Sequence, residues 1–198
     1  LRKVHGGSIA VRGKEITNLS PATIIDEHKV AHIPEDRQKR GLVFEFDVAE
    51  NMVLQSYAKP LFARGFTLLW DNIYNNARQL ISRFDIRPTD PQVPAKALSG
   101  GNQQKMIIAR EVSHGPELLI AAQPTRWLDV CAIEYVHKAL VNQRDEGKAV
   151  LLISFELDEV MHVSDRIAVI FEGKIVGMIA AEGADENQLG LMMAGGAA

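Results

Sequence analysis

Leu98-Ser99-Gly100-Gly101-Asn102-Gln103-Gln104-Lys105 is the stretch that decides the fold, and the apolar run Met106-Ile107-Ile108-Ala109-Arg110 follows it directly. A turn of small residues that leads into such a run predicts a loop opening a helix, with Ser99 as the N-cap. Gly100 and Gly101 leave backbone N–H groups accessible, because neither carries a side chain. A helix N-terminus of this kind favours anions, above all phosphate. The stretch therefore predicts a phosphate site, although a plain glycine-rich turn with an ordinary N-cap would share this local pattern.

Length and composition are those of an ordinary globular chain. The 198 residues carry a formal net charge of -3, with 46% hydrophobic and 24% charged, which fits one domain with room for a subdomain. The near-neutral net charge gives no indication of a basic surface that would bind nucleic acid. No apolar run approaches the roughly 18 residues of a membrane span. Cys131 is the only cysteine and the six histidines lack ligand spacing, so we expect neither an internal disulfide nor a metal centre built on these residues.

Apolar runs predict the strands of an α/β fold. They cover residues 8–11, 30–33, 118–121, 150–153 and 166–170. The middle runs are continuous rather than alternating, which is typical of strands covered on both faces of a parallel sheet. Helical patterns at 129–145 and 156–163 alternate with them, so we expect a mostly parallel sheet with helices on both faces. The last run turns at Glu172-Gly173 into a second apolar run at 174–179, which predicts a C-terminal β-hairpin.

Residues 46–96 have a different character. One helical pattern starts near the beginning of this segment and another covers 69–84, with no strand signal between them, and three prolines then end the region. We therefore expect a helical subdomain at 46–96, inserted into an α/β core made of 1–45 and 97–198. A short helix is expected at 186–194.

The octapeptide Leu98–Lys105, as it stands, matches the signature loop of ATP-binding cassette (ABC) ATPases, in the form that resembles sugar and nucleoside importers. The resemblance covers nearly the whole chain and is weakest over 1–28 and 55–75. It implies a P-loop NTPase-like fold, with ATP and Mg²⁺ as cofactors of a transport-coupled ATPase. The implied partners are another cassette, integral membrane permease subunits and, indirectly, an extracytoplasmic substrate-binding protein. The implied location is peripheral, at the cytoplasmic face of the membrane.

The segment after this loop departs from the family pattern. Pro116–Arg126 is similar to a Walker B strand, which in the family ends in an Asp that supports Mg²⁺ and a Glu that polarises the attacking water. Ala122 and Gln123 stand at these two places. Ala122 offers no oxygen, and Gln123 cannot accept a proton, so we expect a poorly catalytic site. A buried strand ending in a Pro-Thr turn would satisfy the same pattern without any catalysis.

Two further segments match the family with substitutions. Thr125–Asp129 resembles the D-loop, in which Asp129 would order the opposing site of a dimer; the alternative is that Asp129 only caps the next helix. Trp127 and Cys131 stand where the family usually has glycine, and two outcomes for the dimer stay open: the Trp127 indole clashes with the partner, or it packs against it. Phe155 stands where many family members have a histidine that contacts the γ-phosphate, and a phenyl ring cannot donate that hydrogen bond.

Glu35, in Ile33-Pro34-Glu35-Asp36-Arg37, falls at the family's Q-loop position; the alternative is a solvated charged turn after a strand. The resemblance implies that nucleotide contacts come from Ser99, Gly100, Gly101, Gln103, Glu35 and Asp129. No G-x-x-x-x-G-K-[ST] phosphate loop is present in the 198 residues. We expect that loop upstream of Leu1, which would make the chain most of a second cassette without its N-terminal part.

The resemblance thus implies a nucleotide-binding domain of an importer for a simple sugar or a nucleoside, and Ala122-Gln123-Pro124-Thr125-Arg126 favours the nucleoside branch. This half is expected to supply its signature loop in trans to a competent first cassette, and to be inactive alone. Three alternatives stay open: a competent ATPase with unusual substitutions, an ABC protein of translation or DNA repair without a membrane partner, and an interaction module with a vestigial nucleotide site.

Overall fold

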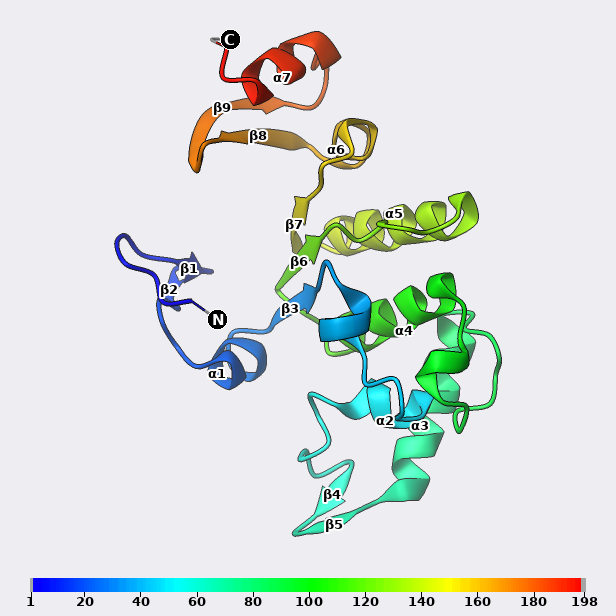
Figure 1. Cartoon of the computed structure of the whole chain (residues 1–198). Helices are drawn as coiled ribbons and strands as arrows, with labels where there is room; N and C mark the ends of the chain where they lie inside the picture. The colour runs from blue at the N-terminus through cyan, green and yellow to red at the C-terminus, as the bar shows by residue number, and fades with distance from the viewer. Residues whose placement is uncertain (1, 197–198) are drawn as a thin grey trace. The chain divides into compact units, whose positions relative to one another are not determined.

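The computed structural model describes residues 2–196 (Figure 1). The chain divides into two compact units, Leu1–Leu151 and Leu152–Ala198. Within the described residues, no helix combines the length and the apolar character that crossing a membrane requires. The larger unit contains every predicted site residue except Phe155.

A parallel pair of strands lies at the centre of the larger unit. Strand β3 (Val30–Ile33) pairs along its whole length with β6 (Leu118–Ala122), and β7 (Ala149–Ile153) completes the order β3-β6-β7. Ile33 and Leu119 are fully buried. The continuous apolar runs therefore did predict the parallel pairing of β3 and β6, which is confirmed.

Helices cover this sheet. Helices α1 (Pro21–Asp26) and α4 (Gly100–Ser113) both pack against β3, and α5 (Val130–Asp145) packs against α4. Met106–Ile108 of α4 are almost completely buried, so the apolar run after the glycines anchors the helix in the core. The helix predicted from the opening octapeptide is confirmed, with Ser99 as its N-cap.

The segment 46–96 is mainly helical but contains a hairpin that the sequence pattern did not reveal. Its elements are α2 (Val48–Val53), β4 (Ala63–Arg64), β5 (Thr67–Leu68) and α3 (Trp70–Arg83). The expectation of no strand here is wrong. Each strand has two residues, too few for an alternating pattern, and Gly65 closes the turn at φ +62. Helices α2 and α3 pack on each other and on α4; the subdomain bounds remain a prediction.

Short elements border these helices. The π-helical turn η1 (Arg37–Gly41) follows β3 and is capped by Asp36, and the 3-10 turn η2 (Ala95–Ala97) precedes the signature-like loop. Near the N-terminus, the predicted strand 8–11 is reduced to β1 (Ala10–Val11), which pairs antiparallel with β2 (Lys14–Glu15).

The smaller unit consists of α6 (Leu157–Val163), β8 (Arg166–Phe171), β9 (Lys174–Ala180) and α7 (Glu186–Met193). Strands β8 and β9 form an antiparallel hairpin, which confirms the hairpin expected at the C-terminal end. Its core gathers Ile167, Val169, Leu189 and Met192. Helix α7 thereby covers one face of the hairpin with apolar side chains.

Candidate functional site

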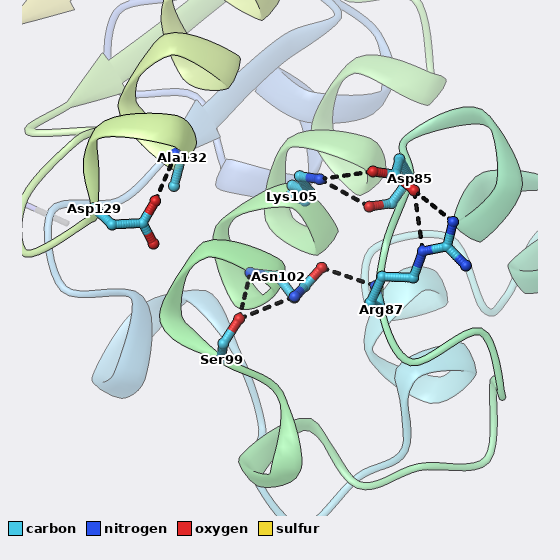
Figure 2. A network of polar contacts seen from close by, with 7 residues as sticks. All are labelled: Asp85, Arg87, Ser99, Asn102, Lys105, Asp129 and Ala132. Carbon is cyan, nitrogen blue, oxygen red and sulfur yellow. Dashed lines mark hydrogen bonds and ion pairs between the residues drawn. The ribbon is translucent and has the colours of Figure 1, made fainter.

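Ser99 caps α4 with its side chain. Its Oγ accepts hydrogen bonds from the backbone N–H of Asn102 at 3.4 Å and from Asn102 Nδ2 at 2.9 Å (Figure 2). The first intrahelical bond runs from the Gln103 N–H to the Ser99 carbonyl at 2.9 Å. The N–H groups of Gly100 and Gly101 belong to the first turn and have no acceptor within the helix. The capped helix N-terminus predicted from the sequence is therefore formed, and its binding of an anion stays a prediction.

Neighbouring side chains approach both glycines closely. A Cβ atom at position 100 would lie 2.8 Å from Nη2 of Arg37. A Cβ atom at position 101 would lie 3.1 Å from the Cβ of Ala132 and 3.9 Å from Oδ2 of Asp129. Gly100 thus lies against the Arg37 guanidinium, which a Cβ atom would push aside, and Gly101 lies against the start of α5, which a Cβ atom would force to shift by a few tenths of an ångström.

Asn102 is a site residue that sequence reasoning missed. Besides its bonds to Ser99, its Oδ1 accepts from the Arg87 backbone N–H at 2.8 Å (Figure 2). One turn further, Lys105 Nζ donates to the Asp85 carbonyl at 2.8 Å and pairs with the Asp85 carboxylate at 3.3 Å. The hydrogen bond from Lys105 lowers the pKa of the Asp85 carboxyl, and Arg87 adds to the effect. The loop after α3 is thus tied to one face of α4.

Gln103 and Gln104 point into the protein. The Nε2 of Gln103 donates to the carbonyls of Ala95 at 3.3 Å and Leu98 at 3.1 Å. The Nε2 of Gln104 donates to the carbonyl of Pro124 at 2.8 Å. Gln103 was expected to contact the nucleotide, but both N–H groups of its amide bind the segment before the helix. Only its amide oxygen remains, and an oxygen acceptor does not attract a phosphate.

Asp129 is the N-cap of α5, with Oδ1 accepting from the Ala132 N–H at 2.9 Å (Figure 2). The capping role that the sequence left open is therefore present, while Oδ2 lies toward Gly101. Trp127, two residues earlier, has a positive φ of 57 and a 76% exposed side chain. Cys131 is exposed. Both substituted glycine positions thus present side chains at the surface of this chain.

Glu35 lies two residues after β3 and is exposed, but it has a partner. Its carboxylate forms an ion pair with Arg126 Nη1, and the Arg126 guanidinium lies over the Trp127 ring, 4.3 Å from its centroid. Arg37 Nη1 donates to the backbone carbonyl of Arg126 at 2.9 Å. Burial lowers the pKa of the Arg37 guanidinium, against an opposing effect of Asp36. The Q-loop-like segment is therefore joined to the turn after β6.

The end of β6 offers poor chemistry for a metal ion. Ala122 has no side-chain oxygen, and Gln123 has a positive φ of 46 with a buried Nε2 that lacks a protein partner. The carboxylate of Glu35 is already paired with Arg126. Among residues 2–196, no cluster of three or more His, Cys, Asp or Glu side chains could hold a metal. Because Mg²⁺ prefers several hard oxygen ligands, this donor set does not fit the magnesium ion that the resemblance implies.

Phe155 lies in the smaller unit, after β7, and is 77% exposed. The preceding Ser154 accepts a hydrogen bond from the Glu156 N–H at 3.0 Å. An exposed phenyl ring at this position leaves no imidazole to contact a phosphate.

A groove of about 270 Å³ opens beside η1. It is lined by Lys39, Arg40, Gly41, Leu42, Val43, Leu54, Gln55 and Arg110. The lining combines the cations Lys39, Arg40 and Arg110 with a short apolar strip.

A buried ion pair forms the floor of this region. Arg110 Nε contacts Glu111 Oε1 at 2.9 Å, and Arg110 Nη1 donates to the Gly41 carbonyl at 2.9 Å. Glu111 also accepts from the His32 backbone N–H at 3.2 Å and from Gln55 Nε2 at 2.9 Å. One pair therefore joins β3, η1, α4 and the chain after α2. Sequence reasoning missed it, although two adjacent charges in an apolar run indicate a buried pair.

Curated proteins similar to this chain are import ATP-binding proteins. The guanosine import ATP-binding protein NupO of Bacillus subtilis is 54% identical over 195 residues, covering 98% of this chain and 38% of that protein. The nucleoside import ATP-binding protein NupA of Lactococcus lactis is 54% identical, covering 99% and 38%. The glucose import ATP-binding protein TsgD13 of Haloferax volcanii is 42% identical, covering 99% and 36%. The chain thus spans less than two-fifths of the length of these relatives.

Solved structures support the fold. A dimeric post-hydrolysis state of an ATP-binding cassette, bound to ADP and Pi, matches with a TM-score of 0.72 at 21% identity, covering 91% of this chain and 75% of that chain. A second ATP-binding cassette of an ABC transporter matches with a TM-score of 0.76 at 20% identity, covering 98% and 77%. The family model described as ABC transporter matches residues 1–126. The chain therefore belongs to the ABC transporter family and has the fold of its ATP-binding cassettes.

Proposed function

We propose that this chain is most of the second cassette of an importer subunit that drives uptake of a nucleoside, or of a simple sugar, by ATP hydrolysis. The similarity supports the nucleoside branch, because the guanosine and nucleoside import proteins are 54% identical to the chain and the glucose import protein 42%. The subunit would lie at the cytoplasmic face of the membrane. Its partners would be a first cassette, permease subunits and, through them, an extracytoplasmic substrate-binding protein.

The observation that carries the proposal is the intact start of α4. Ser99 is held by Asn102, and the glycine N–H groups remain outside the helical hydrogen bonds. Preorganised N–H groups at a helix N-terminus stabilise developing negative charge without a proton transfer of their own. The loop therefore suits the γ-phosphate of an ATP whose other contacts, including Mg²⁺, come from the first cassette. Gly101 and Asp129, packed together at the dimer-facing D-loop, would orient this loop.

The second half of the proposal is that this cassette contributes little hydrolysis itself. Ala122 and Gln123 provide neither a carboxylate ligand for Mg²⁺ nor a general base, and Phe155 provides no imidazole. Gln123 is able to hydrogen-bond a water molecule but not to accept its proton, which general-base catalysis requires. ATP and Mg²⁺ would then be used productively at the site completed by the first cassette.

The groove beside η1 is the surface that we assign to the permease. It adjoins Glu35 along the chain, and Arg110 fixes its floor through the Gly41 carbonyl. A permease segment bound in this groove would move when the Q-loop-like turn at Glu35 moves. Copurification of the full-length subunit with an integral permease supports this assignment; copurification with ribosomes or DNA instead would favour the alternative of a non-transport ABC protein.

Ser99→Arg, made in the full-length subunit assembled with its permease, tests the trans role. The larger cationic side chain removes the cap and fills the approach to the glycines, so ATP turnover is expected to disappear. Ser20→Arg is the matched control, because Ser20 also caps a helix, α1, and accepts from the Thr23 N–H at 3.1 Å. Turnover that is unchanged by Ser99→Arg contradicts the proposal.

A further inference from the structure

We propose that Glu35, Arg37 and Arg126 form a clasp that holds the signature loop in place, and that Arg126 neutralises the charge of Glu35. Arg37 is the positioning residue of this clasp. The inference rests on the proposed function, in that the loop held by the clasp is the one offered to ATP of the first cassette.

The first contact is between Arg37 and Gly100. Nη2 of Arg37 lies 2.8 Å from the position that a Cβ atom at residue 100 would occupy. The guanidinium therefore packs directly on the backbone of the first turn of α4. A planar, always charged group at this place sets how far the loop can move toward η1.

The second contact holds Arg37 itself. Its Nη1 donates to the backbone carbonyl of Arg126 at 2.9 Å, while its Nε is buried without a protein partner. Burial lowers the pKa of Arg37 against the opposing charge of Asp36, and the bond to this carbonyl further compensates its partial removal from water. The position of Arg37 therefore follows the position of the turn after β6.

The third contact fixes that turn. The Arg126 side chain reaches back to the Glu35 carboxylate and stacks on Trp127. From the opposite direction, Gln104 of α4 donates to the Pro124 carbonyl at 2.8 Å. The turn is thus held both by the signature helix and by the segment after β3, and a displacement of either one is passed to the other.

The charges in this arrangement come from the chain alone. Glu35, which stands where the resemblance puts the Q-loop residue, is neutralised by Arg126. The clasp should therefore keep its geometry in the absence of divalent cations, and should depend on the opposite charges of residues 35 and 126.

Hydrogen exchange at the backbone amides of residues 99–104 tests the clasp in the full-length subunit without nucleotide. Glu35→Arg and Arg126→Glu are each expected to speed exchange by up to about fivefold, the range for partly exposed ion pairs. The double variant, with the charges exchanged, is expected to restore it. Replacing Mg²⁺ by EDTA is expected to change nothing in the unmodified chain.

Glu134→Lys and Lys138→Glu provide the matched control, because this exposed pair joins residues four apart on α5 without touching the loop. Arg37→Lys tests positioning, since an ammonium group cannot reproduce the planar contact with Gly100 and the Arg126 carbonyl. It is expected to lower kcat for ATP about tenfold with KM unchanged, as misplacement of a group acting in the transition state does.

The clasp is wrong if the single charge reversals leave exchange unchanged, if the double variant exchanges as fast as the singles, or if EDTA alone speeds exchange. These outcomes are separate from those of Ser99→Arg. Unchanged turnover in Ser99→Arg rejects the trans role and leaves the exchange results valid for the clasp. Lost turnover in Ser99→Arg together with unaltered exchange in the charge reversals rejects the clasp alone.

Discussion

The start of α4 and the end of β6 lie in the same unit but differ in how their polar groups are satisfied. At the start of α4, Ser99, Asn102 and Gln103 each make side-chain hydrogen bonds to the surrounding chain. At the end of β6, Ala122 has no polar side-chain atom and Gln123 has a buried amide nitrogen without a protein partner. The side chains of the first region are held by hydrogen bonds, whereas Ala122 and Gln123 of the second make no side-chain hydrogen bond through a donor.

The difference separates two kinds of chemistry. Stabilising a phosphate with backbone N–H groups depends on geometry, which contacts such as the one between Asn102 and Ser99 maintain. Orienting a metal or activating a water depends on carboxylates with suitable pKa values. A chain that keeps the first and lacks the second fits a cassette that acts on a phosphate bound elsewhere, which is the proposed role.

Gly101→Val in the full-length subunit should give the largest effect. A Cβ atom there already approaches Ala132 to 3.1 Å, and the two methyl groups of valine would push α4 and α5 apart. We expect ATP turnover to fall by about 10²-fold or more, because a misplacement of about 1 Å costs that much. Ala122→Val, of similar added bulk at the end of β6, is the control and should be far milder. Equal losses in the two variants would remove the contrast between the regions.

Asn102→Ala should give an intermediate effect. The change deletes the bonds to Ser99 and to the Arg87 N–H, each of 2.9 Å or shorter. One such bond contributes about 0.5–1.5 kcal/mol, so turnover should fall by about three- to tenfold. Asn75→Ala is the control, because Asn75 contacts only Arg78 on the exposed face of α3 among the bonds described. The prediction is checked by measuring the steady-state ATP turnover and the thermal midpoint of both variants.

The signature region was the more predictable of the two because its signals are local. A serine followed by two glycines and an apolar run predicted the cap and helix that the structure has. The contact from Asn102 to Arg87 joins residues 15 apart through a loop, and spacing does not reveal such a pair. The hairpin β4–β5 was not predicted for a different reason, because strands of two residues are too short to show an alternation of apolar and polar residues.

Gln103 shows a signal that was present and went unused. Positions 103, 107 and 110 follow the i, i+4, i+7 spacing of one helix face, and all three side chains are buried. The periodicity therefore favours an inward Gln103, whereas motif resemblance alone suggested a phosphate contact. The pairing of Glu35 with Arg126 had no such signal, because its partners are 91 residues apart.

Asp85→Asn should have a smaller, pH-dependent effect at the signature end. Lys105 lowers the pKa of Asp85 below its ordinary value of 3.8. A carboxyl with a lowered folded-state pKa stabilises the fold above pH 3.8, and this contribution is lost as the pH falls through the folded-state value. The variant should therefore lower the thermal midpoint slightly at pH 7, and not below the folded-state pKa. A difference between the two proteins that persists in strong acid would show that Asp85 acts other than by its charge.

Gln123→Ala should have the smallest effect, and its sign is informative. The change removes a buried amide nitrogen that has no protein partner, and deleting an unsatisfied group is neutral or stabilising. ATP turnover of the full-length subunit should stay within about twofold, since a site without carboxylates contributes no general base to lose. Gln123→Glu should be equally silent, because Ala122 still offers no oxygen to a metal. A turnover that drops in the alanine variant, or rises in the glutamate variant, would mean that the end of β6 takes part in hydrolysis and that the two regions are less different than their contacts indicate.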